Sequence, residues 1–398
     1  MPARFKLARR HRQAAFPSDQ FRSGRPRIRF DRDELAFGLK SAIVPWLVTR
    51  MIVIPVIFMA REIATKGHLP LAMADVAKEG LFSWDAGWYA LIAAHGYGAA
   101  GHSALRFFPL VPLLARGVSY LPFMSVRLSL LAVSNLSALL GLALMVVLVK
   151  QETGDSATAV RSAWLMSLAP AAFTYVMGYA EATLLVLTVA TFITLRNRRW
   201  WWAMVFGILA GLTRPIGILL AIPAIIEGLH EFRQAAFRER LGRLAAVGGG
   251  PLGVLSYLVF LGFYYHRPLA PITIERRHRG GFTDPLVTLY HEVALLVGGH
   301  HLEEALHLPW ALLAIALVAV AFWKLPASYG AFGAAVVLVA LSGRNIDSFE
   351  RYAMSAFPLV IAGAMVTSGP KMERYVLAML TAGLVAYSTL GFLHLYVP

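Results

Sequence analysis

Long apolar runs are the feature that most constrains this chain. Runs of about 17–25 mainly apolar residues recur along most of its length, and a helix needs that length to cross a bilayer core of roughly 30 Å. Hydrophobic residues make up 58% of the chain and charged residues 15%, whereas a soluble domain carries about 25% charged residues. Lipid offers the backbone no hydrogen-bond partners, so spans must be helices or closed barrels. Strand-like alternation, the sign of a barrel, is absent. We therefore predict an all-α, polytopic transmembrane protein.

The charge pattern argues for a membrane orientation and against nucleic-acid binding. The formal net charge is +15, with 37 Lys and Arg against 22 Asp and Glu. The basic residues lie in short segments between apolar runs, as in the RNRR stretch Arg196–Arg199. Such segments are typical of cytoplasmic loops. The chain has no cysteine, which excludes disulfides, thiolate catalysis and cysteine-ligated zinc.

The positions of the basic segments give a membrane topology. Residues 1–36 are Arg-rich and are expected to form a disordered cytoplasmic tail near anionic lipid, not a cleaved signal peptide. Residues 37–398 are expected to form a single transmembrane domain. Residues 62–104 and 266–307 are expected to be two long loops outside the cytoplasm. About 11 spans are predicted, at 40–61, 127–149, 159–177, 181–195, two half-spans within 200–228, 244–265, 308–323, 325–341, 353–368 and 374–395.

Two of these segments are predicted to be irregular. Residues 200–228 have basic residues on both sides, which requires an even number of crossings in about 28 residues. Two short helices that meet at Arg214-Pro215 satisfy that requirement, and such broken helices tend to line cavities. Residues 105–121 are apolar but contain two prolines, so we expect an interfacial or re-entrant segment there.

The stretch WDAGWY at 84–89 places one carboxylate, Asp85, among large aromatic rings. Trp84, Trp88 and Tyr89 are residue types that favour the headgroup level of a membrane, and their rings could also stack on a sugar. Asp85 could instead only cap a helix, because Asp is favoured at that position.

Other charged residues are predicted to collect at the same, outer side of the membrane. A charge within a span costs about 2.5–3.5 kcal/mol on insertion scales, so it usually marks a pathway or a site. Each also has a structural alternative: a snorkelling arginine, an ion pair, an interfacial anchor or a solvated patch. The residues are Arg106, Glu181, Arg214, Arg276, Arg277, Arg344 and Arg351.

Carboxylates and arginines in one place suit two classes of protein. A carboxylate can take a proton from a hydroxyl, and arginines can hold a phosphate and stabilise its departing charge. An enzyme that uses a lipid-phosphate sugar donor needs both functions beside the bilayer. The alternative is a transporter or flippase that carries an anionic glycolipid. Transporters often have internal repeats and charges at mid-bilayer. No repeat is visible here, which favours the enzyme.

Six segments carry a resemblance to a known family. They are WDAGWYALIAAHGY at 84–97, RFFPLVPLLARG at 106–117, VSNLSALLGLAL at 133–144, LAPAAFTYVMGYAEATLLVL at 168–187, GILAGLTRPIGILLAIPAI at 207–225 and SFERYAMSAFPL at 348–359. In this order they resemble the PIG-V family of mannosyltransferases, within the GT-C class of glycosyltransferases. The resemblance implies a GT-C type fold, a polyprenyl- or dolichyl-phosphate sugar donor, an acceptor outside the cytoplasm and inversion at the anomeric carbon.

The resemblance gives Asp85 a role, and the chemistry of the other candidate residues suggests theirs. Asp85 is implied as the general base. The predicted donor-phosphate ligands are Arg214, Arg351, Arg344 and Arg106. The predicted acceptor or sugar ligands are Trp84, Trp88, Tyr89, Tyr179 and Glu181. The sugar is implied to be mannose, while the acceptor stays open: a lipid, a glycan or a protein. We expect a monomer in a bacterial inner membrane, with its N-terminus in the cytoplasm.

A metal site is not expected. The second predicted loop holds His291, Glu292, His300, His301, Glu303, Glu304 and His307. Imidazole and carboxylate are ligands for zinc or manganese, but no HExxH-type motif occurs. No Asp-x-Asp adjoins Asp85 either. The prediction is a transferase without a metal cofactor.

Overall fold

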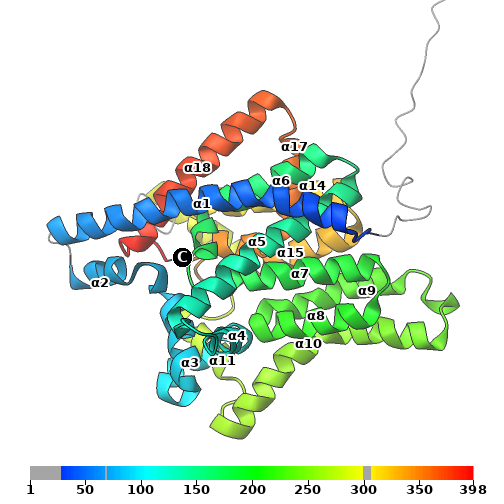
Figure 1. The fold of residues 1–398 in the computed structure, drawn as a ribbon, viewed down its shortest axis with the longest axis horizontal. Coiled ribbons are helices and arrows are strands. Elements are labelled where there is room, and N and C mark those ends of the chain that lie inside the picture. The colour runs from blue at the N-terminus through cyan, green and yellow to red at the C-terminus, as the bar shows by residue number, and fades with distance from the viewer. Residues whose placement is uncertain (1–27, 68–69, 299–305, 398) are drawn as a thin grey trace, which may run out of the picture.

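The structure is a computed structural model that describes residues 28–67, 70–298 and 306–397. Within these ranges every regular element is a helix, and the only β-type pairing is an isolated bridge between Phe282 and Gly343. Figure 1 shows α5 (Val126–Thr153), α7 (Glu181–Arg196), α8 (Trp200–Thr213) and α10 (Phe237–Tyr265) side by side, with α1 (Arg32–Lys66) crossing above them. Gathered at one end are α2 (Leu71–Glu79), α3 (Asp85–Ala100), α4 (Leu110–Val118) and α11 (Ala270–Arg279). The predicted all-α architecture is confirmed.

Among the described residues, four helices are long and apolar enough to cross a membrane: α1 (Arg32–Lys66), α5 (Val126–Thr153), α10 (Phe237–Tyr265) and α18 (Pro370–Phe392). Helices also lie at the other predicted span positions, and most of those are shorter. They are α6 (Ser156–Leu168) with η4 (Pro170–Tyr175), α7 (Glu181–Arg196), α8 (Trp200–Thr213), η5 (Pro215–Leu220) with α9 (Ala221–Leu229), α14 (Leu308–Lys324), α15 (Ala327–Leu341), α16 (Phe349–Met354) and α17 (Phe357–Val366).

The two segments predicted as long loops are largely helical. The first contains α2 (Leu71–Glu79), η2 (Gly80–Phe82), α3 (Asp85–Ala100) and η3 (His102–Arg106). The second contains α11 (Ala270–Arg279) and α12 (Pro285–Gly298). The segment predicted to be interfacial holds the short α4 (Leu110–Val118), and η6 (Phe232–Gln234) precedes α10. Their length and polarity did not reveal that the chain forms helices there.

The basic tail also ends earlier than predicted. Helix α1 begins at Arg32, so residues 32–36, which the sequence placed in the tail, are helical. The Asp31 side chain accepts a hydrogen bond from the Glu34 N–H at 2.9 Å, and acidic residues Asp33 and Glu34 lie in the first turn. Both features favour a helix start. Residues 1–27 lie outside the described ranges.

The break predicted at Arg214 is confirmed. Helix α8 ends at Thr213, and Arg214 is extended (φ −156°, ψ 150°), as expected for a residue before proline. Helices α8 and α10 approach each other through glycines: a Cβ at Gly211 would lie 2.4 Å from the Gly250 carbonyl oxygen. Such close backbone contact between small residues is typical of helices packed in membranes. It places the Arg214 break firmly against α10.

Helix α7 forms the centre of the molecule. Fifteen of its 16 residues are buried, as expected for a helix that is apolar nearly all round. It begins at Glu181 and ends at Arg196, both of which are buried. At about 1.5 Å per residue these two charges lie about 22 Å apart. Each end of α7 therefore needs a local partner for a buried charge.

Candidate active site

Asp85 is the first residue of α3, at the end of the molecule where Glu181 begins α7. The residue before it, Trp84, has a positive φ of 58°, which is strained for a side chain of this size. The Asp85 N–H donates to the Tyr179 hydroxyl at 3.3 Å. Two arginines, and not the helix N-terminus alone, neutralise the carboxylate. The capping alternative therefore does not account for this residue.

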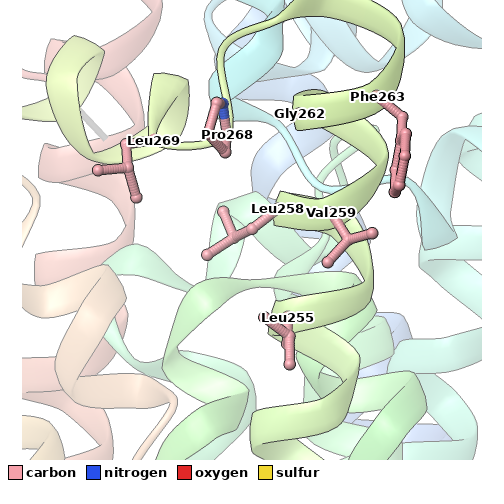
Figure 2. Close-up of a pocket in the computed structure, with 7 residues that line it drawn as sticks. All are labelled: Leu255, Leu258, Val259, Gly262, Phe263, Pro268 and Leu269. Atoms are coloured by element: carbon pink, nitrogen blue, oxygen red, sulfur yellow. The ribbon is translucent and has the colours of Figure 1, made fainter.

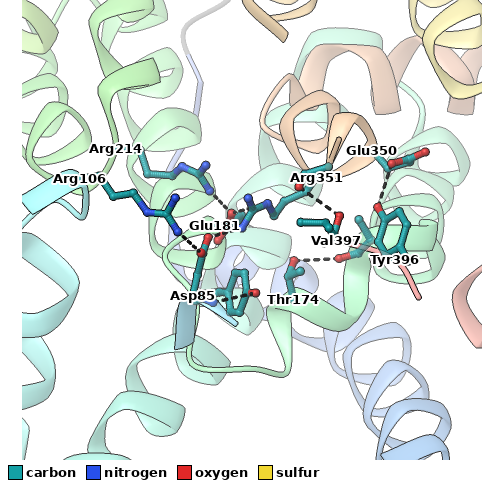
Figure 3. A network of polar contacts seen from close by, with 12 residues as sticks. Asp85, Arg106, Thr174, Glu181, Arg214, Glu350, Arg351, Tyr396 and Val397 are labelled. Carbon is teal, nitrogen blue, oxygen red and sulfur yellow. Dashed lines mark hydrogen bonds and ion pairs between the residues drawn. The ribbon is translucent and has the colours of Figure 1, made fainter. Parts of the chain in front are cut away.

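Arg351 and Arg106 are these two arginines (Figure 3). Arg351 Nη1 donates to Asp85 Oδ2 at 2.6 Å, and Arg106 Nη2 lies 3.6 Å from Asp85 Oδ1. Arg106 ends η3, and Arg351 lies in the six-residue helix α16. Two segments separated by more than 200 positions thus meet at one carboxylate.

A second carboxylate joins the group. Arg214 Nη1 donates to Glu181 Oε1, and Arg351 Nε lies 3.5 Å from the same oxygen. Arg351 therefore bridges Glu181 and Asp85. We call Asp85, Arg106, Glu181, Arg214 and Arg351 the charge cluster. Three guanidinium groups against two carboxylates leave it with a formal charge of +1.

The charge cluster is buried at one side and open at the other. The side chains of Glu181 and Arg351 are 3% and 6% exposed, and that of Arg214 is 12% exposed. Asp85 and Arg106 keep 23% and 22% of their side chains accessible. A molecule approaching the cluster would therefore meet Asp85 and Arg106 first.

One buried oxygen in the cluster is unpaired. Glu181 Oε2 has no hydrogen-bond partner among the described residues, although the side chain is almost fully buried. Burying a carboxylate oxygen without a hydrogen-bond donor costs free energy, so such an atom in a folded protein needs an explanation. A hydroxyl group of a bound substrate would supply the missing donor.

The Asp85 carboxylate is held in its ionised form. Burial raises its pKa, but the nearby Arg351 and Arg106 charges outweigh that effect, and the pKa lies below its ordinary value. For Arg351 burial lowers the pKa, while the Asp85 charge more than restores it, so the guanidinium stays charged. The cluster thus holds a base in its proton-accepting form beside fixed positive charges.

Aromatic rings surround the arginines of the cluster. The Arg351 guanidinium lies 5.5 Å from the Tyr179 ring centre. The Tyr352 ring lies within cation–π distance of both Arg214, at 5.0 Å, and Arg351, at 5.3 Å. Tyr352 is not among the site residues predicted from the sequence, although its place in the SFERYAMS segment next to Arg351 is a usable signal.

The aromatic residues of WDAGWY contact two different parts of the chain. Trp88 and Tyr89 both pack on Phe107, with ring centres 6.0 Å and 5.2 Å away. The Phe107 ring in turn lies 4.8 Å from the Arg106 guanidinium. Trp84 points elsewhere: its indole N–H donates to the Gly391 carbonyl at 2.9 Å. The rings thus fix the surroundings of Asp85, while their predicted contact with a sugar remains a prediction.

The remaining predicted arginines lie apart from the cluster. The Arg344 side chain is exposed and packs beside Gly280, at the end of α11. Arg276 and Arg277 lie on α11 and are exposed as well. The structure therefore brings together three of the four arginines predicted to bind the donor phosphate.

The histidine-rich segment is only partly described. His300, His301, Glu303 and Glu304 lie outside the described residues. His307 Nδ1 lies 2.8 Å from Glu350 Oε2, so its described partner is a single carboxylate from α16. Within the described ranges, no group of three or more His, Cys, Asp or Glu is arranged to hold a metal ion.

An apolar groove lies on α10 at its junction with α11 (Figure 2). Its walls are aliphatic and aromatic, with Leu255, Leu258, Val259 and Phe263 on α10 and Leu269 just before α11. No charged side chain lines it. It therefore offers nothing to fix a phosphate or a sugar, and the charge cluster remains the candidate active site.

The charge cluster lies mostly within a recognised family segment. Residues 63–245 match the family model described as Mannosyltransferase (PIG-V), which confirms the resemblance found in the sequence. Asp85, Arg106, Glu181 and Arg214 fall inside the match, whereas Arg351 lies beyond it. No curated protein and no solved structure gave a significant match to this chain.

Proposed function

We propose that this membrane protein, in which residues 63–245 match the family model described as Mannosyltransferase (PIG-V), moves mannose from a polyprenyl-phosphate donor to an acceptor hydroxyl outside the cytoplasm. The acceptor is a lipid, a glycan or a protein. The single observation that carries the proposal is the charge cluster, in which an ionised, partly accessible Asp85 touches two of three arginines.

The proposed reaction is a direct displacement with inversion. The acceptor oxygen attacks the anomeric carbon of the mannose and forms the new C–O bond. The bond from that carbon to the phosphate oxygen breaks, and its electron pair leaves with the lipid phosphate. Asp85 takes the hydroxyl proton. A well-placed base contributes about 10²–10⁴ in rate.

The arginines are proposed to hold the donor phosphate. A lipid phosphodiester carries one negative charge, which would balance the +1 charge of the cluster. Arg214 and Arg351 are the best placed, because both already hold an anionic oxygen of Glu181. Fixed guanidinium groups stabilise the charge that develops on the leaving phosphate. Glu181 Oε2, which has no donor among the described residues, would accept a substrate hydroxyl.

The reaction is proposed to need no metal ion. The three guanidinium groups supply the positive charge that a divalent cation provides in many transferases. Treatment with a chelator such as EDTA should leave the rate within about twofold of the untreated enzyme. Loss of activity that returns with added Mn²⁺ or Mg²⁺ would contradict this part of the proposal.

The orientation follows from the two ends of α7. Arg196–Arg199 form a basic segment of the kind found in cytoplasmic loops, and Glu181 lies at the opposite end of the helix. The charge cluster would then face away from the cytoplasm, and the N-terminus would lie on the cytoplasmic side of a bacterial inner membrane. One chain supplies all five residues of the charge cluster, so we propose a monomer.

The test is a donor-consumption assay with purified protein in lipid. The protein is incubated with several polyprenyl-phosphate sugars and a membrane extract that supplies acceptors. Consumption of the mannosyl donor with formation of a mannosylated product is the expected result. A flippase would move labelled donor lipid between leaflets without consuming it. Folded protein that consumes no donor would overturn the proposal.

A further inference from the structure

Helix α16 cannot orient Arg351 by itself. The helix has six residues, Phe349–Met354, well below the length at which an isolated helix is stable in water. Its N-cap residue, Ser348, has a left-handed backbone conformation (φ 62°) and makes no side-chain cap. The direction of Arg351 must therefore depend on contacts from other parts of the chain.

Those contacts come from the end of the chain, where Figure 3 shows Tyr396 beside Glu350, and from His307, the N-cap residue of α14. The Tyr396 hydroxyl donates to Glu350 Oε2 at 2.9 Å, and the His307 ring lies 2.8 Å from the same oxygen. The Ser348 hydroxyl donates to the Val397 carbonyl at 3.1 Å. Both side chains of the Glu350–His307 pair are at most 4% exposed, so these bonds are shielded from water. Glu350 precedes Arg351, so whatever fixes Glu350 also fixes the backbone that carries Arg351.

The same end of the chain holds the residue before Asp85. The Trp84 indole N–H donates to the Gly391 carbonyl at 2.9 Å. The His394 ring packs on the Trp84 ring, with centres 4.7 Å apart. We call residues 391–397, which comprise the last two residues of α18 and the segment after it, the C-terminal clamp.

We propose that the C-terminal clamp positions the Asp85–Arg351 pair, and that Tyr396, acting through Glu350, is a positioning residue for Arg351. The inference rests on the proposed function, because it gives the clamp its role in transfer. One short segment bonds to the neighbours of both partners of the pair: Trp84 beside Asp85, and Glu350 beside Arg351. The Tyr396 hydroxyl donates to Glu350, which lies outside the charge cluster, so Tyr396 acts on catalysis through Glu350.

The first test is Tyr396→Phe, which removes one hydroxyl and keeps the ring. A loosened Arg351 should lower kcat/KM by about tenfold, mainly through a higher KM for the mannosyl donor. The matched control is Tyr329→Phe, because the Tyr329 hydroxyl donates to the buried Glu152 carboxylate at 3.1 Å, far from the cluster. The control should leave kcat/KM within about twofold. Equal losses in both variants would overturn the proposal.

The pH profile separates positioning from a general loss of structure. The groups that bear on the Asp85 carboxylate are Arg351, Arg106, Arg214 and the Tyr179 and Tyr89 hydroxyls. Arg351 favours the ionised carboxylate, so its displacement should raise the pKa of Asp85. The acid limb of kcat/KM in Tyr396→Phe should then move to higher pH. An acid limb that stays where it is in the wild type would contradict the clamp.

A third readout does not depend on transfer at all. Melting temperatures are measured for Tyr396→Phe, Asp85→Asn and the double variant, and for the same cycle with Tyr329→Phe. Coupled residues give non-additive shifts, while distant residues give additive ones. The Tyr396 cycle should be non-additive and the Tyr329 cycle additive. If the wild type transfers no sugar, the proposed function fails, and this cycle still decides the clamp. Additive shifts in both cycles would overturn it.

Discussion

Each end of α7 buries a charged side chain, but the two ends do so in different ways. At one end Glu181 joins the charge cluster. At the other end, Arg196 donates to both oxygens of Glu152 and lies 3.6 Å from Glu227. The Tyr329 and Ser328 hydroxyls donate to these carboxylates at 3.1 Å and 2.7 Å. We call Glu152, Arg196, Glu227, Ser328 and Tyr329 the inner polar network.

The two groups differ in whether their carboxylate oxygens all have partners and in how far their side chains are exposed. In the inner polar network all four carboxylate oxygens have a partner, and the three charged side chains are at most 8% exposed. In the charge cluster, Glu181 Oε2 has no hydrogen-bond partner among the residues that the structure describes; the cluster also carries a net positive charge and is open at Asp85. A complete network of buried charges holds helices together, whereas an incomplete one retains capacity for a ligand. We therefore assign a structural role to the inner polar network and a catalytic role to the charge cluster.

The largest effect is expected from Asp85→Asn. Asn keeps the size of the side chain but cannot accept the proton, so kcat/KM should fall by about 10²–10⁴. The donor-consumption assay measures the loss, and the melting temperature confirms that the protein is folded. Glu152→Gln, the matched change in the inner polar network, should leave turnover per folded molecule nearly intact. A loss in Asp85→Asn of less than tenfold would remove Asp85 as the base.

Arg196→Met should act on stability instead of chemistry. It leaves Glu152 and Glu227 buried beside each other without a cation, and loss of one partner from a buried pair costs about 3–5 kcal/mol. Chemical unfolding in detergent, followed by circular dichroism, measures the change. The surface variant Arg198→Met is the control, because its pair with Glu231 is about half exposed. A stable Arg196→Met protein with lost turnover would reverse the assignment of the two ends.

Glu181→Gln tests the unpaired oxygen. The amide removes one negative charge and puts an NH₂ group where an acceptor oxygen can lie, so a substrate hydroxyl should bind less well. A bond from a hydroxyl to a carboxylate is worth about 1.5–3 kcal/mol, so the KM of one substrate should rise by about tenfold or more. Separate titration of donor and acceptor identifies which one. Unchanged KM values for both would show that Glu181 serves only as an ion-pair partner.

The smallest expected effect is on the acid limb of the profile of kcat/KM against pH, where activity falls as the pH is lowered. Arg351 and Arg106 outweigh burial, so the pKa of Asp85 lies below its ordinary value of 3.8. The base form, and the stability that its ion pairs add, should persist down to that pH and be lost as pH falls further through the lowered pKa. A profile of kcat/KM in the free enzyme measures the limb. In Arg106→Gln it should move to higher pH. A wild-type limb near pH 6 would conflict with this charge environment.

Much of the site was predictable because each part has a local signal. The WDAGWY stretch, the Arg214-Pro215 break and the Glu181 start of α7 stand out in apolar surroundings. The structure brings these three segments together with Arg351. Arg344 has the same local signal but lies apart, exposed beside Gly280. A charged side chain in an apolar stretch marks an important position, but the sequence does not show which other residue it contacts.

The sequence by itself determined the apolar helices at the predicted spans, the break at Arg214 and the identity of the charged groups. These follow from hydropathy, backbone sterics and the cost of burying charge, all of which act over a few residues. Only the tertiary structure decided that Arg351 reaches Asp85 across 266 positions, and that Tyr396 fixes Glu350. Such pairings depend on how whole helices pack, and packing depends on many weak contacts that no short stretch of sequence encodes.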